Sequence, residues 1–233
     1  MSSPIVLSKI PGFDPQKVPV LGVDDHLRPL TREEYSAQSI FERFQADSER
    51  PPYSPLLAPF GAQAQAPKKE ASVLVGLVQR QEVTLLLTQR AAHLKTHSGQ
   101  VAFPGGKIDP EDASAEAAAL REAHEEVGLE AQHVRVLGRL RPLETGTAFR
   151  ITPVVALVDA HHVIDFNTHE VAQVFEVPMS YLMNPANHRK HRLELHGQTR
   201  EWYSMPYHDG EKEHFIWGAT AAMIRNFYGF LST

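Results

Sequence analysis

The chain of 233 residues contains no cysteine. This absence excludes disulfide bonds, thiolate catalysis and metal sites with cysteine ligands, so the fold must be held together by packing. The sequence also has no apolar run of the roughly 18 to 20 residues that a membrane helix needs, and no pattern typical of a signal peptide. We therefore expect a cytoplasmic protein that does not contact a membrane.

An excess of positive charge is missing as well. The chain has 23 Lys and Arg against 28 Asp and Glu, which gives a formal net charge of -5. Proteins that bind nucleic acid usually present a positive field to the phosphate backbone, so we expect no nucleic-acid partner. A local basic cluster is still able to bind a small phosphorylated molecule.

Proline is concentrated in the N-terminal part, where ten of the 17 prolines precede residue 70 and five fall within residues 51–67. Such a stretch interrupts regular structure, which predicts an extension over residues 1–70 and a main domain over residues 71–233. Residues 31–47 have the apolar spacing of an amphipathic helix with Thr31 as its N-cap. This helix packs either on the main domain or on a second subunit of a homodimer. We expect a chain that lacks residues 1–66 to remain folded.

The composition after residue 70 favours alternating strands and helices. Strands are expected at residues 72–78, 83–88, 134–141, 149–159, 171–177, 192–194, 199–204 and 214–216. Helices are expected at residues 114–127, 180–183 and 218–231. Because no regular strand–helix–strand repeat is present, the pattern predicts an α+β fold with a mixed β-sheet flanked by helices.

Three glutamates on one predicted helix are the most informative feature. Glu122, Glu125 and Glu126 lie at positions i, i+3 and i+4, so their carboxylates share one face. Each i,i+4 pair of like charges costs roughly 0.2–0.5 kcal/mol, and a divalent cation removes that cost. The glutamates alone fit a solvated helix surface, but the upstream corner at Gly105 and Gly106 lets backbone carbonyls approach a metal. We therefore expect Mg²⁺ or Mn²⁺ at this helix.

The ends of the same helix carry capping residues. Asp112 precedes it and is expected to cap its N-terminus. Gly128 is expected to end it in a left-handed conformation.

Residues 106–129 resemble the Nudix signature, in which a glycine is followed by an acidic residue and then by Arg-Glu-aliphatic-x-Glu-Glu-x-Gly-aliphatic. The segment 121–129 matches, with the small Ala123 at the first aliphatic position. The spacing from Gly106 to Arg121 is one residue longer than usual, and Asp112 replaces the usual loop glutamate.

The upstream residues 86–106 are similar to the motif of the coenzyme A pyrophosphatase branch, which carries this longer glycine loop. The motif reads Leu-Leu-Thr-x-Arg-Ser/Ala, then a basic residue, then a glycine and then Phe-Pro-Gly-Gly. Lys95 stands where the branch usually has arginine, which keeps the charge but loses the bidentate fork.

The resemblance implies a Nudix fold, an α/β/α sandwich, and metal-assisted hydrolysis of the pyrophosphate bond of coenzyme A or its acyl derivatives. It implies that Glu122, Glu125 and Glu126 bind the metal, with the Gly105 carbonyl as a further ligand. Their neighbour Arg121 is expected to orient a glutamate by a charge-assisted hydrogen bond.

The role of Glu170 is less constrained, because it is either a surface residue or a carboxylate that faces the metal site as ligand or as base for the attacking water. The residues expected to contact the substrate are Arg90, Lys95, His97, Phe103 and Gly106. The basic ones meet the pyrophosphate or the 3′-phosphate, or they are solvated loop charges. Phe103 either packs behind the glycine corner or forms part of the pocket wall.

Two other functions remain open at this point. A Nudix pyrophosphatase for another nucleoside diphosphate derivative, such as ADP-ribose or NADH, would keep the metal helix and need no 3′-phosphate site. A binding module that lost catalysis would not need the intact set of three glutamates. The 13 histidines do not have the spacing of a zinc protease.

Overall fold

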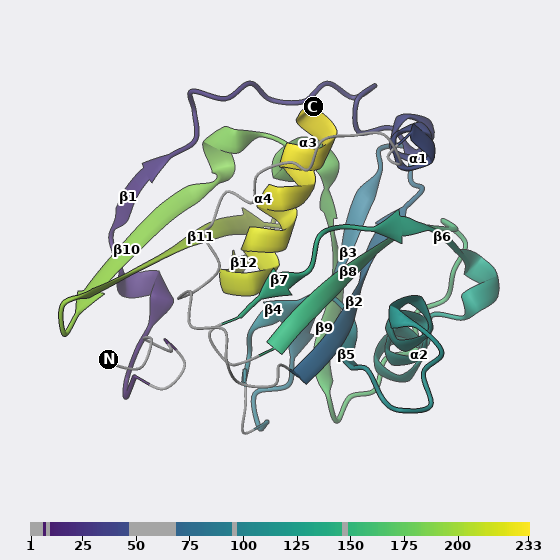
Figure 1. Cartoon of the computed structure of the whole chain (residues 1–233), viewed down its shortest axis with the longest axis horizontal. Helices are drawn as coiled ribbons and strands as arrows, with labels where there is room; N and C mark the ends of the chain where they lie inside the picture. The colour runs from purple at the N-terminus through teal and green to yellow at the C-terminus, as the bar shows by residue number, and fades with distance from the viewer. Residues whose placement is uncertain (1–6, 8–9, 47–68, 95–96, 146–148) are drawn as a thin grey trace.

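The protein is described here by a computed structural model that covers residues 7, 10–46, 69–94, 97–145 and 149–233 (Figure 1). The proline-rich segment 51–67 and Lys95 lie outside the described residues.

The larger of two sheets has eight strands and is built around the parallel pair of β2 (Lys69–Val78) and β8 (Phe149–Val158). The side chains of β2 are buried on both faces, because they contribute to two separate apolar clusters. This burial explains why the strand reads as a nearly continuous apolar run. The other strands of this sheet are β3 (Thr84–Arg90), β4 (Val101–Ala102), β5 (Gly105–Lys107), β6 (Val134–Arg139), β7 (Leu143–Glu144) and β9 (Val171–Pro178).

A second sheet of four antiparallel strands has the order β1-β10-β11-β12. Its strands are β1 (Val20–Val23), β10 (Arg189–Leu195), β11 (Gln198–His208) and β12 (Glu213–Trp217). The helix α4 (Gly218–Ser232) follows β12 and packs between the two sheets.

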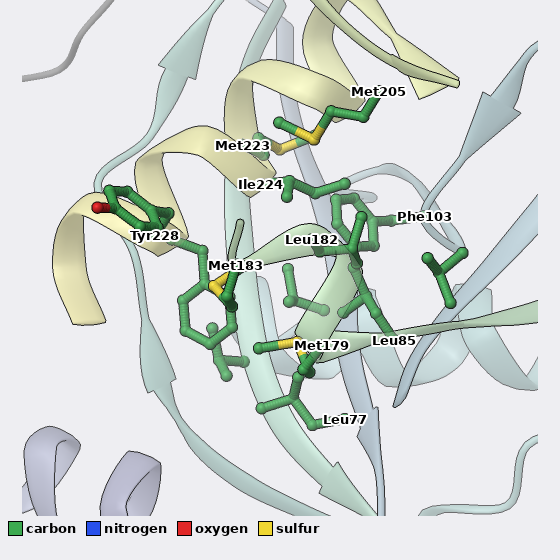
Figure 2. Packing of buried hydrophobic residues seen from close by; sticks show 14 of the residues in the cluster. Leu77, Leu85, Phe103, Met179, Leu182, Met183, Met205, Met223, Ile224 and Tyr228 are labelled. Atoms are coloured by element: carbon green, nitrogen blue, oxygen red, sulfur yellow. The ribbon is translucent and has the colours of Figure 1, made fainter. Parts of the chain in front are cut away.

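Helices cover both faces of the larger sheet. α2 (Ala115–Val127) packs on one face, on a cluster that includes Leu74 and Leu86. α4, α3 (Met179–Leu182) and α1 (Ala37–Ala46) contribute to the larger cluster on the other face. Figure 2 shows the centre of that cluster. It contains Met223 and Ile224 of α4, Leu85 of the larger sheet and Met205 of the smaller sheet. The expected mixed sheet between helices is confirmed, and no helix in the described part of the chain is long and apolar enough to cross a membrane.

The predicted helix at residues 31–47 is shorter than expected, because α1 begins at Ala37. Thr31 and Glu34 do exchange the two hydrogen bonds of a capping box, but the residues that follow form a turn and not the first turn of α1. A second cap follows at Ser36, whose hydroxyl accepts a hydrogen bond from the Ser39 N–H at 3.2 Å. The chain therefore starts its helix one turn later than the first capping residue indicates.

The N-terminal extension packs on the main domain. Ile40 of α1 is fully buried in the larger cluster, and β1 pairs with β10. The buried Asp24 accepts a hydrogen bond from Arg225 Nε of α4 at 2.9 Å and pairs with Lys190. The division at residue 70 and the folding of a chain that lacks residues 1–66 stay predictions. From these contacts we propose that residues 10–46 fold together with the domain.

We expect Ile40→Ala to lower the free energy of unfolding by about 2–5 kcal/mol, because it removes fully buried methyl groups and leaves a cavity. Leu21→Ala is the matched control, since Leu21 lies in the same extension and is 57% exposed. Urea denaturation of both variants measures the difference. Equal midpoints for the two variants and the wild type would mean that α1 is detached in solution.

Candidate functional site

The glycine corner at Gly105 and Gly106 forms β5 and brings the backbone close to α2. Gly105 has φ of 155°, and a Cβ there would lie 2.4 Å from the carbonyl oxygen of Ser72. A Cβ at Gly106 would lie 2.3 Å from Glu122 Oε1. Gly105 therefore requires glycine, because the colliding atoms belong to the backbone of β2, whereas a side chain at Gly106 would displace the carboxylate of Glu122.

Both ends of α2 are capped. Ser114, not the expected Asp112, is the N-cap, and its hydroxyl accepts a hydrogen bond from the Ala117 N–H. The carboxylate of Asp112 instead accepts two hydrogen bonds from Arg121, and it does not cap the helix. The prediction for Gly128 is confirmed, since it ends the helix with φ of 70°.

The carboxylates of α2 differ in exposure. The side chain of Glu126 is only 5% exposed, whereas Glu122 is 17% and Glu125 is 55% exposed. Glu126 Oε2 accepts a hydrogen bond from the Gly105 N–H at 3.1 Å. Burial raises the pKa of Glu126 to about 7 although this hydrogen bond opposes the shift. Burial also raises the pKa of Glu122.

Arg121 links the carboxylates of the helix to the loop before it. Its Nη1 lies 3.1 Å from Glu122 Oε1 and 3.1 Å from Glu125 Oε2. Its Nη2 donates to Asp112 at 2.9 Å and to the carbonyl of Lys107 at 3.1 Å. With this many acceptors the guanidinium is fixed, and it fixes the rotamers of the two glutamates in turn.

Glu170 approaches the same carboxylates from the loop before β9. Its negative charge contributes to the raised pKa of both Glu122 and Glu126, after burial as the main cause. Asn167 holds this loop in place, because its N–H donates to the carbonyl of Glu126 at 2.9 Å and its side chain reaches Glu170 Oε1 at 3.4 Å. No sequence motif indicates this contact, because Asn167 and Glu126 lie in segments that are distant in the chain.

Arg90 is the predicted substrate residue that reaches the carboxylates. Its Nη1 lies 3.5 Å from Glu126 Oε1, and its buried Nε has no hydrogen-bond partner among the described residues. His97 is exposed, and its Nδ1 lies 2.9 Å from Gln100 Oε1. Phe103 is 3% exposed and belongs to the core cluster. This burial favours packing behind the glycine corner, one of the two roles expected for the ring, and contact of Phe103 with substrate stays a prediction.

The donor chemistry at α2 fits a hard divalent cation. Glutamate oxygens are the ligands that Mg²⁺ and Mn²⁺ prefer, and the raised pKa values of Glu122 and Glu126 show that their charge lacks a sufficient partner. Within the described ranges, no three acidic or histidine side chains already enclose a metal position. The side chains of Arg121 and Arg90 lie against the carboxylates instead.

Comparison with known proteins agrees with the motifs. A family model of the NUDIX domain matches residues 68–218. Curated proteins named "Uncharacterized Nudix hydrolase NudL" from Yersinia pestis (strain Pestoides F) and Yersinia pseudotuberculosis serotype O:1b (strain IP 31758) are each 45% identical over 163 residues, which is 69% of this chain and 79% of the relative.

Solved structures with a similar arrangement include an Ap4A hydrolase from C. elegans, with a TM-score of 0.41 and 20% identity over 50% of this chain and 85% of that one. Another is the NUDIX domain of Shewanella oneidensis NrtR complexed with ADP ribose, with a TM-score of 0.39 and 20% identity over 52% of this chain and 79% of that one.

We expect Mg²⁺ or Mn²⁺ to raise the melting temperature of the wild type, because the ion binds the folded state. At 100 times the dissociation constant the gain is about 2.7 kcal/mol, which is a shift of roughly 5 to 10 °C for a chain of this size. Glu126→Gln should lose most of this shift. In EDTA it should melt at or above the wild-type temperature, since an amide is less costly to bury than a carboxylate and still accepts the Gly105 hydrogen bond.

Glu111→Gln is the control, because it removes the same charge from an exposed position just before α2. Thermal melts with and without the ion should show the full shift for this variant. A full shift for Glu126→Gln as well would exclude Glu126 from the metal site.

Proposed function

This chain belongs to the NUDIX family of pyrophosphohydrolases, and we propose that it hydrolyses the pyrophosphate bond of coenzyme A or its acyl derivatives. The products are 3′,5′-ADP and 4′-phosphopantetheine or its acyl form. The observation that carries the substrate assignment is the motif in residues 86–106, which occurs together with the complete glutamate set. One residue of that motif, Arg90, lies 3.5 Å from Glu126.

We assign metal binding to Glu122, Glu125 and Glu126, with the Gly105 carbonyl as a further ligand. Bound Mg²⁺ or Mn²⁺ supplies charge neutralisation of the pyrophosphate and lowers the pKa of the attacking water. The hydrogen bonds of Arg121 orient Glu122 and Glu125 for this purpose.

Glu170 is our proposed base, because its charge acts on Glu122 and Glu126 and its carboxylate is held by Asn167. Arg90 and Gly106 contact the pyrophosphate in this proposal, with Lys95 and His97 on the substrate's outer phosphates. The buried Nε of Arg90 has no hydrogen-bond partner in the part of the chain that the structure describes, and a phosphate oxygen would supply one, which supports this role of Arg90. Location in the cytoplasm and a homodimer stay predictions.

A panel of coenzyme A, dephospho-coenzyme A, ADP-ribose and NADH, each with Mg²⁺ or Mn²⁺, tests the substrate assignment. We expect the highest kcat/KM for coenzyme A, and we expect mass spectrometry to identify 3′,5′-ADP and 4′-phosphopantetheine. A 3′-phosphate contact predicts a higher KM for dephospho-coenzyme A, because a charge-assisted hydrogen bond is lost. Faster cleavage of ADP-ribose or NADH would replace coenzyme A as the substrate.

Glu125→Gln should lower kcat by at least about a hundredfold at saturating metal, because it removes a charge that faces the bound ion. Its melting temperature should stay near that of the wild type, since the side chain is 55% exposed. Glu111→Gln again serves as the control for charge and should keep its turnover. Near-normal turnover of Glu125→Gln would remove this carboxylate from the mechanism.

A further inference from the structure

A hollow outside the glutamate site, which we call the N-terminal pocket, lies at the end of β3 and has a volume of about 370 Å³. Three segments form it: residues 13–16 of the extension, residues 97–101 before and in β4, and the strand β12. Such a volume is within the range of roughly 300–1,000 Å³ that is typical of small-molecule sites.

Three partly exposed aromatic side chains, Phe13, Phe215 and Trp217, line the pocket. Phe13 is fixed in place because its ring packs edge-on against the buried Trp202 at 5.8 Å and lies 6.2 Å from Trp217. Asp14 holds the segment that follows, since its carboxylate accepts a hydrogen bond from the Gln16 N–H at 3.0 Å. The aromatic wall is therefore formed before any ligand binds.

Most polar groups in the lining of the pocket are hydrogen-bond acceptors or amides. The lining contains the carboxylates of Asp14 and Glu213, the amides of Gln16, Gln89 and Gln100 and the imidazole of His97, but no lysine or arginine among the described residues. A neutral planar group with hydrogen-bond donors fits this lining, because it stacks on the rings and donates to carboxylate or amide oxygens.

The pocket is connected to the carboxylates of α2 through the last two residues of β3. Gln89 lines the pocket, whereas the side chain of Arg90 reaches Glu126. The two side chains thus reach different sites, although the pairing of β3 with β9 is irregular between Gln89 and Arg90, and Figure 1 shows β12 and α2 on the two sides of β3. The N–H of Arg90 also donates to the carbonyl of Gln100 at 3.0 Å, which ties the pocket wall to the same residue.

From this arrangement we infer that the N-terminal pocket binds the nucleobase of the substrate and that Phe13 of the extension forms part of its wall. The inference rests on the proposed function only in that the substrate has a nucleotide half. Its ribose passes over the end of β3, and its pyrophosphate reaches Arg90 and the glutamates.

Isothermal titration of the full chain with AMP and with ribose 5-phosphate tests this inference, because the two ligands differ only in the base and neither contains a pyrophosphate to be hydrolysed. One base stacked on an aromatic ring should raise affinity about fivefold to a hundredfold. Trp217→Ala and Phe13→Ala should each lose most of this preference, whereas Trp217→Phe should keep it. Phe41→Ala is the control, since Phe41 is a partly exposed aromatic residue that lines a different hollow.

Equal affinity for AMP and ribose 5-phosphate, including no detectable binding of either, would overturn the inference, and so would an equal loss in Phe41→Ala. Titration with 4′-phosphopantetheine completes the test. If its affinity rather than that of AMP depends on Trp217, the pocket holds the pantetheine arm and the inference is wrong. If AMP depends on Trp217 but coenzyme A is not cleaved, the pocket stands and only the proposed substrate fails.

Discussion

The close approach between the glycine corner and α2 is the constraint on which the site depends. At Gly105 a Cβ would collide with β2, and at Gly106 it would collide with Glu122. Because both side chains are absent, β5 can pair with β2 and lie under α2 at the same time. The result is that the backbone N–H of Gly105, the buried carboxylate of Glu126, the half-buried carboxylate of Glu122 and the end of β3 lie close together.

The close approach of β5 to α2 also buries the carboxylate of Glu126 and leaves its negative charge with few partners. A pKa of about 7 for Glu126, against an ordinary 4.5, corresponds to a cost of roughly 3 kcal/mol for its charged form. The apolar face of α2 opposes this cost, since Ala119, Ala123 and Val127 are fully buried against the sheet. The helix therefore keeps its position by packing on one face while the other face holds charges that disfavour it.

Much of this arrangement follows from the sequence, and the parts that do not have physical reasons. The long strands and α2 have strong apolar patterns, and their approximate positions were predicted. β4, β5 and β7 have only two or three residues, which is too short for any periodicity to show. β1 was missed because it is an edge strand with exposed apolar side chains.

Prediction from the sequence has the same limit at the candidate site, where local patterns are visible and tertiary contacts are not. Glu122, Glu125 and Glu126 lie within five residues of one another, and their shared face could be predicted from helix geometry alone. The contact between Arg90 and Glu126 joins segments 36 residues apart, so it depends on how β3 and α2 pack. The position of Phe103 in the core and the role of Asn167 depend on the same tertiary packing.

Two buried carboxylates in this chain show how structural and functional charges differ. Asp24 is as deeply buried as Glu126, and burial opposes its charge, but hydrogen bonds from Lys190 and Arg225 hold its pKa below the ordinary value. Its charge is satisfied within the protein, and the pair fixes the extension against α4. Glu126 has one N–H and one distant guanidinium, and its pKa is raised. A carboxylate left with this deficit beside a glycine corner is a position where an external cation adds what the protein does not provide.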